Sequence, residues 1–267
     1  MREPQAVVEC EPTTLAAALR RAVLAGEGAE PREEVFVRVD AGGIETPASG
    51  VDASERSFCT FHPSLFDDLR SVDGISALLP VAELLGWLDW FGDSPAVAVE
   101  LLGQPGAATA EAVRIESGDR EVVFDCVRSG EAVDGIECTL PDRFDGTQFL
   151  DAGGDPVPTA IETTAGELLT VVEAVARSEG VEYYPLALDA GELRFEVEGD
   201  GVRAAGTLDA AADGPGFAAR YGPGFERTVR TLDGTVTLQT GPDEPLALVS
   251  RSAGATYRHV LSPVEAE

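Results

Sequence analysis

Residues 217–264, "FAARYGPGFERTVRTLDGTVTLQTGPDEPLALVSRSAGATYRHVLSPV", carry the most specific structural signal in the chain. The stretch predicts a strand and a helix, then two further strands on either side of an acidic turn. On a helical wheel Phe225 and Val229 share one face, which we expect to be buried. Arg227 and Arg230 fall near the opposite side. The helix is therefore expected to expose two arginines about one turn apart.

The composition is strongly acidic. The 267 residues include 48 Asp and Glu against 19 basic residues, all of them arginine, and the net charge is −29. Such a balance argues against nucleic-acid binding, because phosphate contacts need a cationic surface. It is also typical of proteins adapted to molar salt, where the Debye length falls to about 3 Å. We favour this halophilic interpretation, under which the position of each arginine is more informative than the net charge.

The length suits two domains of ordinary size, and a hydrophobic content of 44% allows each of them a core. No apolar run approaches the ~18 residues that a membrane span needs, and the N-terminus "MREPQAVVEC" lacks a signal-peptide core. We therefore expect a cytoplasmic protein without membrane association. The four cysteines include no Cys-x-x-Cys pair and are expected to be reduced and mostly buried.

The sequence contains an internal repeat, because its two halves show similar patterns of residues in the same order. "VVECEPTTLAAALRRAV" (7–23) matches "AIETTAGELLTVVEAVA" (160–176), and "VFVRVDAGGIE" (35–45) matches "YPLALDAGELR" (184–194). Each half predicts a strand, a helix, a hairpin with an Asp-Ala-Gly turn, a second helix and more strands. The pattern indicates a duplicated α+β unit.

A long connector separates the two halves. Its sequence, "PDRFDGTQFLDAGGDPVPT", is rich in Pro, Gly and Asp, and its only large apolar residues are Phe144, Phe149 and Leu150. A connector that only linked the two halves would not need phenylalanines, so we expect this connector to be functional. The predicted division is an N-terminal domain at 1–140, the connector at 141–158 and a C-terminal domain at 159–267.

An α+β half used twice around a long connector resembles the DNA sliding clamp family, the proliferating cell nuclear antigen and its archaeal relatives. The most specific match is the C-terminal end, where the family's "Y-x-L-A-P-x-I" pattern falls on Tyr257, Leu261, Ser262, Pro263 and Val264. The resemblance implies antiparallel sheets with two helices per domain. It also implies a homotrimeric ring that encircles duplex DNA and tethers replication and repair proteins, without a cofactor.

In clamps, the helices of each subunit line the inner wall of the ring. By the resemblance, five arginines on three helices would face DNA: Arg20, Arg21, Arg177, Arg227 and Arg230. Arginine placed on exposed helix faces only for solubility remains an alternative. About five phosphate contacts would lose roughly 10⁴-fold in affinity per tenfold rise in salt. A ring tolerates this loss, because its topology keeps it on the duplex.

The second helix, "PVAELLGWLDWFGD" (80–93), departs from this pattern. An apolar stripe is predicted at Val81, Leu85 and Leu88, and no basic residue is available on the opposite face. We interpret the two tryptophans as a sign that the helix is buried on more sides than the wheel suggests. An unusual contact surface is the alternative. The predicted outer face comprises Glu83, Gly86, Trp87 and Trp90.

The resemblance implies two further surfaces. Edge strands of neighbouring subunits would pair to close the ring, through strands expected at 121–127 and at 193–199 or 202–208. The interface residues would be Phe124, Phe195 and Val197. Partner peptides would dock beneath the connector beside the C-terminal tail. The residues of that partner-peptide pocket would be Pro47, Val51, Phe149, Leu150, Pro245, Ser262, Pro263 and Val264.

Catalysis is not expected. The two histidines, His62 and His259, lie far apart in sequence, and "GPGFE" (222–226) lacks the lysine and the spacing of a phosphate-binding loop. We expect no catalytic residue, metal or cofactor. The remaining rival is a divergent paralogue that keeps the clamp architecture and acts as a protein-interaction module without encircling DNA. Thr46 and Pro47, which replace the family's hairpin Asp-Pro, favour that rival, as does the less apolar tail.

Overall fold

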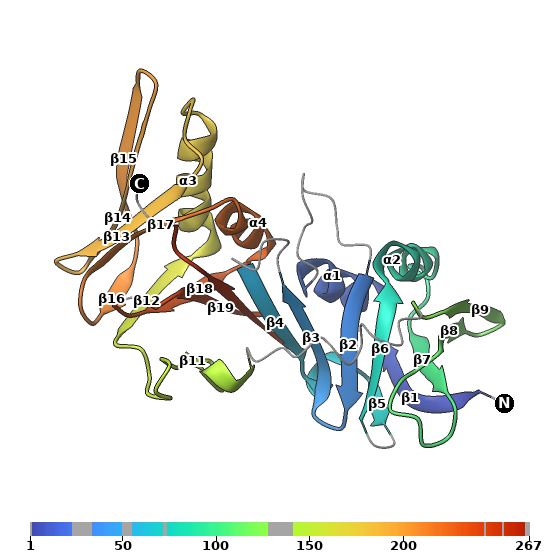
Figure 1. Ribbon diagram of the computed structural model, residues 1–267. Coiled ribbons are helices and arrows are strands. Elements are labelled where there is room, and N and C mark those ends of the chain that lie inside the picture. Colours follow the sequence, from blue (N-terminus) through green and yellow to red (C-terminus); the bar gives the residue numbers. More distant parts are fainter. Residues whose placement is uncertain are drawn as a thin grey trace. The chain divides into compact units, whose positions relative to one another are not determined.

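The structure is a computed structural model that describes residues 2–22, 34–49, 55–71, 74–127, 141–242, 244–252 and 254–264 (Figure 1). The chain divides into two compact units, which do not follow chain order alone. The first unit comprises Met1–Ala48, Phe58–Cys138 and Ala253–Thr256, and the second comprises Ser49–Ser57, Thr139–Ser252 and Tyr257–Glu267.

The first unit combines two β-sheets with two helices. Its elements are β1 (Glu3–Cys10), α1 (Pro12–Ala22), β2 (Glu34–Asp40), β3 (Gly43–Ser49), β4 (Glu55–Phe61, begun in the second unit), β5 (Asp68–Ser71), β6 (Ile75–Pro80), α2 (Val81–Trp90), β7 (Val97–Gly103), β8 (Ala112–Ser117) and β9 (Arg120–Asp125). One sheet has the strand order β5-β1-β7-β8-β9, and the other strands follow the order β4-β3-β2-β6. Helices α1 and α2 pack against each other (Figure 1).

The second unit repeats this architecture after a connector with two short strands. Its elements are β10 (Phe144–Asp145), β11 (Gln148–Phe149), β12 (Thr159–Thr164), α3 (Ala165–Ala176), β13 (Tyr184–Asp189), β14 (Glu192–Gly199), β15 (Val202–Leu208), β16 (Ala211–Asp213), β17 (Phe217–Tyr221), α4 (Gly224–Thr231), β18 (Thr235–Thr240), β19 (Leu246–Ser252) and β20 (Ala255–Leu261). The strands follow the orders β16-β12-β18-β19-β20 and β15-β14-β13-β17, and α3 packs against α4 (Figure 1).

The two units have the same strand order in their sheets. β5, β1, β7, β8 and β9 occupy the places that β16, β12, β18, β19 and β20 occupy in the second unit. β4, β3, β2 and β6 correspond in the same way to β15, β14, β13 and β17. The duplicated α+β unit predicted from the sequence repeat is therefore confirmed.

The core of the second unit lies between its helix pair and its sheets. Leu168 and Val172 of α3 are fully buried, and so are Phe225 and Val229 of α4, as the helical wheel predicts for α4. The Thr164 hydroxyl caps α3 by accepting a hydrogen bond from the Glu167 amide at 3.1 Å. Apolar spacing and a capping residue together explain why this segment is a helix.

Helix α2 differs from its predicted pattern in one position. Val81 and Leu88 are buried as expected, but Leu84 completes the buried stripe and Leu85 is only half-buried. Leu84 lies one turn before Leu88, so the buried face is rotated from the predicted one.

The Asp-Ala-Gly turns form the predicted hairpins. Asp40 pairs with Gly43 across the first hairpin, and Asp189 pairs with Glu192 across the second. Gly43 has φ +136°, and a Cβ at this position would lie 2.1 Å from the Phe61 carbonyl oxygen. Only glycine fits this close approach to β4.

His259 lies in β20 with a fully buried side chain. Among the residues that the structure describes, neither ring nitrogen has a hydrogen-bond partner. Burial lowers the pKa of His259 from 6.5 to about 4, because desolvation disfavours the imidazolium. The side chain is therefore neutral at pH 7.

This pKa predicts an acid-sensitive contribution to stability. The unfolded chain binds a proton near pH 6.5 and the folded chain only near pH 4, so stability present above pH 6.5 is lost as pH falls towards 4. The loss should reach about 3 kcal/mol. Urea unfolding of the parent and of His259→Leu at several pH values tests this. The difference between them should shift by that amount between pH 7 and pH 4, and a constant difference would contradict the assignment.

Candidate functional site

The five arginines predicted to face DNA lie on or directly after helices α1, α3 and α4. Arg20 and Arg21 are in the last turn of α1, Arg177 caps the C-terminus of α3, and Arg227 and Arg230 lie on α4. Arg20, Arg177, Arg227 and Arg230 form ion pairs with carboxylates of their own unit. The pairs are Arg20–Asp89 at 2.8 Å, Arg177–Glu173 at 3.5 Å, Arg227–Glu55 at 3.0 Å and Arg230–Glu226 at 2.7 Å.

Arg227 is held inside the fold. Its Nε and Nη2 atoms donate to one Glu55 oxygen at 3.1 and 3.0 Å, and the Thr228 hydroxyl donates to the other at 2.6 Å. The Glu55 side chain is 0% exposed and the Arg227 side chain only 19%. The expectation that Arg227 lies on an open face is therefore wrong, because a buried carboxylate draws its guanidinium inward. Arg230 does remain exposed.

Helix α2 exposes one of its tryptophans. Trp90 is 48% exposed, so the interpretation that both tryptophans are buried is wrong for this residue. A basic residue also reaches this face, although none was expected. Arg120 of β9 stacks its guanidinium over Trp90 at 5.4 Å and over Phe91 at 5.2 Å from the ring centres. This contact could not be predicted from the sequence, because β9 begins about 30 residues after the end of the helix.

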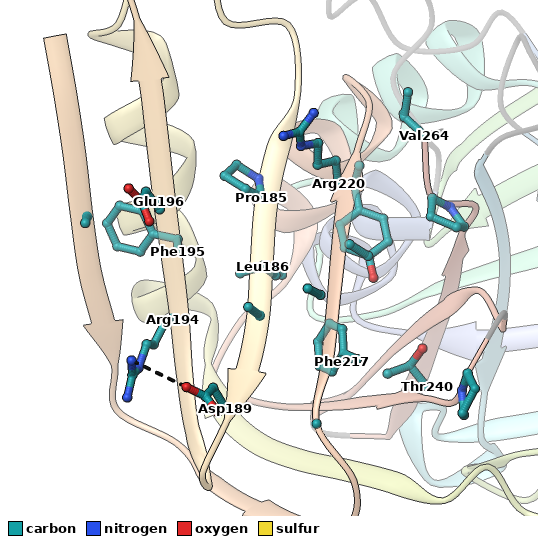
Figure 2. A pocket seen from close by; sticks show the side chains of 18 of the residues that line it. Pro185, Leu186, Asp189, Arg194, Phe195, Glu196, Phe217, Arg220, Thr240 and Val264 are labelled. Carbon is teal, nitrogen blue, oxygen red and sulfur yellow. Dashed lines mark ion pairs between the residues drawn. The ribbon is translucent and has the colours of Figure 1, made fainter. Parts of the chain in front are cut away.

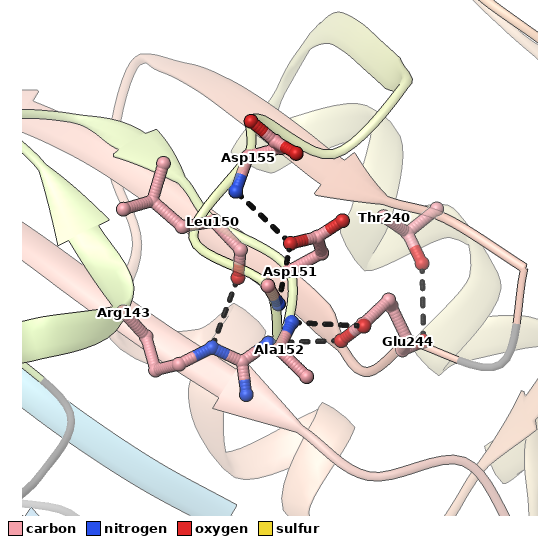
Figure 3. Close-up of polar contacts among 8 residues, drawn as sticks. Arg143, Leu150, Asp151, Ala152, Asp155, Thr240 and Glu244 are labelled. Carbon is pink, nitrogen blue, oxygen red and sulfur yellow. Dashed lines mark hydrogen bonds and ion pairs between the residues drawn. The ribbon is translucent and has the colours of Figure 1, made fainter.

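The connector is fixed to the second unit by its phenylalanines and by polar contacts. Phe149 is fully buried, and Arg143 stacks over its ring at 4.8 Å. Gln239 of β18 accepts a hydrogen bond from the Phe149 amide at 2.7 Å and donates to the Thr147 carbonyl at 2.7 Å. Figure 3 shows Arg143 donating to the Leu150 carbonyl and Glu244 accepting from the Ala152 amide. The connector is thus ordered against β18 and the turn after it.

A cavity of about 1,020 Å³ opens on the second unit beside the C-terminal tail. Figure 2 shows Pro185, Phe217, Arg220 and Val264 around it, with the Asp189–Arg194 ion pair at one end. Two of the predicted partner-peptide residues, Pro263 and Val264, line this cavity together with Pro242 and Glu244 of the β18–β19 turn.

The other predicted pocket residues are distributed differently. Phe149 packs in the interior, so it is not available as a pocket wall. Leu150 and Pro245 are half-buried and Ser262 is exposed, but none of the three lines the cavity. Pro47 belongs to the first unit, and Val51 lies outside the described residues. Sequence reasoning missed the cavity wall formed by β13, β14 and β17, which has no motif of its own.

The free edge of β17 runs along this cavity. The Val264 amide donates to the Arg220 carbonyl at 2.7 Å, so the outward backbone groups of β17 are those of Arg220 and, two residues earlier, Ala218. In the first unit the same position is Ser76 of β6, which pairs with residues 108–110 at 2.9 and 2.8 Å. The β18–β19 turn of the second unit is shorter than the β7–β8 segment of the first unit, which contains residues 108–110. Among the described residues, nothing pairs with the outward groups of Ala218.

The predicted interface residues point into the chain. Phe124, Phe195 and Val197 are buried at 7% exposure or less, because they occupy the inward phase of their alternating strands. Their side chains are therefore not available for a subunit contact. The residues that do face outward are Val123 of β9, at 49%, and Val202 of β15, at 42%. Both strands are sheet edges. The alternation predicts two faces, but not which of them is buried.

Comparisons with solved structures decide the fold. The proliferating cellular nuclear antigen of Entamoeba histolytica matches 98% of this chain and 100% of its own length with a TM-score of 0.73 at 11% identity. A. fulgidus PCNA, solved with the C-terminal region of FEN-1 bound, gives 0.72 at 14% identity with the same coverage. The PCNA2–PCNA3 complex from Sulfolobus tokodaii gives 0.67 at 11% identity, over 96% of this chain and 98% of that one.

The chain has the sliding-clamp fold. The resemblance drawn from the sequence is thereby confirmed at the level of the fold. A scan against protein-family models finds no match, and a search of curated proteins finds none either.

Within this clamp fold, the described residues hold no group of three or more His, Cys, Asp or Glu side chains able to bind a metal ion. Cys10, Cys59 and Cys126 are buried. Burial raises the pKa of the Cys10 thiol to about 12 and that of Cys126 to about 11, so these thiols are un-ionised at neutral pH. The helices described are all too short or too polar to cross a membrane.

The two arginines of α4 should differ sharply in their effect on stability. Arg227→Ala leaves a fully buried carboxylate without its guanidinium, and we expect the free energy of unfolding to fall by about 3 kcal/mol. Arg230→Ala removes an exposed i,i+4 pair and should cost about 0.5 kcal/mol or less. Urea unfolding at constant salt measures both. Similar small losses would show that the Glu55 pair is not a structural contact.

Proposed function

We propose that the chain is a sliding-clamp-like processivity factor. Three copies would close into a ring around duplex DNA, and replication or repair proteins would dock on each subunit through short peptides. The observation that carries this proposal is the clamp fold over 98% of the chain. The proposed division into domains is 1–140 and 159–267, joined by the connector at 141–158. We propose that the protein acts as a scaffold and not as an enzyme, and that it does so in the cytoplasm.

Ring closure would use the two exposed sheet edges. β9 and β15 each end a sheet and each expose a valine, Val123 at 49% and Val202 at 42% in the described part of the chain. An unpaired edge with an apolar side chain readily pairs with another strand. Pairing of β9 from one copy with β15 from the next is a head-to-tail contact, which closes a ring when the rotation returns on itself. The Sulfolobus tokodaii structure, a complex of two clamp chains, is consistent with contacts of this kind.

DNA would be held by the closed ring more than by direct contacts. Of the five proposed DNA-facing arginines, Arg20, Arg177 and Arg230 keep exposed side chains but are already paired with carboxylates. Phosphate contacts would have to compete with those pairs, and molar salt weakens both. Weak contacts are compatible with a ring and insufficient for an open binder.

The second candidate is a clamp-fold protein that no longer encircles DNA and acts as an interaction module. One observation favours it: α2 presents Trp90 and Glu83, where the other helices carry arginine. The helix itself carries no basic residue, and the one cation shown to stack on Trp90, Arg120, comes from β9.

The size of the protein in about 2 M salt discriminates between the two candidates. Light scattering should give a three-subunit mass for the parent and a one-subunit mass for Val202→Glu, because a carboxylate at the β15 edge obstructs pairing. Val264→Glu, an equally exposed valine in the tail, is the matched control and should keep the three-subunit mass. A monomeric parent would support the interaction module.

Encirclement itself is tested on DNA circles. A ring loaded on a nicked circular duplex should stay bound and should be lost once the circle is cut to a linear form. Equal retention on both templates would rule out a topological mechanism.

We further propose that partner peptides extend along the β17 edge. Among the described residues, the outward N–H and C=O of Ala218 are unpaired, and the first unit fills the equivalent position with its own chain. An extended peptide could supply the missing strand, with an apolar side chain in the cavity beside Val264. The peptide known from the A. fulgidus structure, the C-terminal region of FEN-1, is the natural probe.

Ala218→Pro tests this docking mode. Proline removes the outward N–H at a sheet edge, where it is tolerated, so the fold should persist while affinity for the FEN-1 peptide falls about tenfold. Val264→Glu should weaken the same peptide from the other side of the cavity. Isothermal titration measures both variants, with Val202→Glu as the control that should bind normally. Unchanged affinity in Ala218→Pro would contradict strand addition.

A further inference from the structure

Arg220 of β17 lines the cavity beside Val264, and it differs from the other charged side chains there. Each carboxylate that lines the cavity has an arginine partner. The pairs are Asp189–Arg194 at 3.7 Å, Glu244–Arg143 at 2.8 Å and Glu196–Arg203. Arg220 is exposed, and within the described part of the chain its guanidinium forms no ion pair and donates no hydrogen bond. In a protein of net charge −29, this cation remains available to another molecule.

An aromatic ring holds the Arg220 guanidinium in position. Its central carbon lies 4.5 Å from the centre of the Tyr183 ring, which belongs to a half-buried residue. A guanidinium packed over a ring keeps the N–H donors along its edge for other partners. Glu182, next to Tyr183 in the sequence, is exposed but lies outside ion-pair distance of Arg220 in the described structure. The Arg220 side chain is thus positioned in advance, which lowers the ordering cost of binding an acceptor.

Arg220 points away from the helices of its unit. Side chains alternate along β17, and the neighbouring Tyr221 is buried in the core that α3 and α4 form with the sheets. In the β13–β17 pair, Arg220 lies opposite Pro185 and Ala218 lies opposite Ala187 (Figure 2). All four line the cavity, and we call Pro185, Ala187 and Ala218 the cavity floor. The surface next to Arg220 is therefore made of small apolar residues, and it is not the helix face proposed to meet DNA.

The cavity floor and Arg220 together define the chemistry of an occupant. A planar guanidinium matches both oxygens of a carboxylate, and such charge-assisted hydrogen bonds are stronger than neutral ones. Ala218 and Arg220 share one face of β17 at a spacing of two residues. A peptide strand added along this edge has the same two-residue period. A peptide with an apolar side chain over the floor would therefore place the residue two positions away beside Arg220.

We propose that the peptide docked along β17 carries a carboxylate that pairs with Arg220, two positions from an apolar residue that covers the cavity floor. The inference rests on the docking mode proposed above and names the chemical class of the docked segment. The carboxylate can belong to an Asp or Glu side chain or to a peptide C-terminus, because the guanidinium meets the same two oxygens. The local charges do not oppose an acidic ligand, since each cavity carboxylate is already matched by an arginine.

Synthetic peptides test the carboxylate and its position. The probe is acetyl-Thr-Val-Thr-Glu-Thr-Val-Thr-amide, in which a valine lies two residues from the glutamate on both sides, so that either strand direction fits. Isothermal titration at fixed salt should give about tenfold weaker binding when glutamine replaces the glutamate. Moving the glutamate by one position, onto the other face of the strand, should lose the same factor. Acetyl-Thr-Val-Thr with a free C-terminus tests the second source of a carboxylate and should bind more tightly than its amide.

Variants of the protein assign the preference for glutamate to Arg220. Arg220→Gln should bind the glutamate and glutamine peptides equally, with the affinity that the parent has for the glutamine peptide. Arg220→Lys keeps the charge without the fork of donors and should keep only part of the preference. Tyr183→Leu should also reduce it, because the guanidinium is no longer held in position. The matched control is Arg38→Gln, which replaces an exposed arginine of β2 without an ion pair in the described chain and should retain the full preference.

The outcomes separate this inference from the docking mode itself. Ala218→Pro should weaken both peptides by the same factor and leave their ratio unchanged. Equal affinities of the parent for the glutamate and glutamine peptides would overturn the role of Arg220 and leave docking along β17 intact, whereas binding of neither peptide would overturn both. Tighter binding of the glutamate peptide by Glu265→Gln would show that the chain's own residue after Val264 supplies the carboxylate instead. A DNA oligonucleotide that displaces the peptide from the parent, but does not bind Arg220→Gln, would assign the site to phosphate.

Discussion

Burial of one apolar core between a helix pair and two sheets is the constraint on which each unit depends. In the second unit, Leu168 and Phe225 of the helices meet Ile161 and Leu238 of the strands with no exposure of any of them. Side chains alternate between the two faces of a strand and recur every 3.6 residues around a helix. Burying these core residues therefore fixes the direction in which the other side chains of the same elements point. The residues left outside are those available for partners.

The surfaces left over are few and distinct. Val123 and Val202 lie on sheet edges, Val264 lies beside the cavity, and Trp90 lies on α2. Single exposed apolar residues are ordinary on proteins. The valines coincide with other open features, namely a sheet edge or a cavity wall, and Trp90 lies on an exposed face of α2. That coincidence makes them better candidates for contacts than the acidic surface around them.

Pairing within the chain governs what its arginines can do. In a chain of net charge −29, a guanidinium readily finds a carboxylate, and Arg227 pairs with one that is fully buried. Such a pair is best understood as a structural contact, because removing one partner would leave an unpaired charge in the interior. A clamp built this way would rely on closure around DNA, since topology is indifferent to salt and electrostatic contacts are not.

The sequence by itself determined the duplication, because repeated apolar periodicity and repeated Asp-Ala-Gly turns are local properties. It also determined the buried face of α4, because Phe225 and Val229 lie four residues apart and share one side of the helix. The tertiary structure alone decided the rest. Alternation in β9 and β14 could not say that Phe124 and Val197 face inward, since both phases are permitted until a core covers one. Nor could it pair Arg227 with Glu55 or Arg120 with Trp90, because those contacts join segments that are distant in sequence.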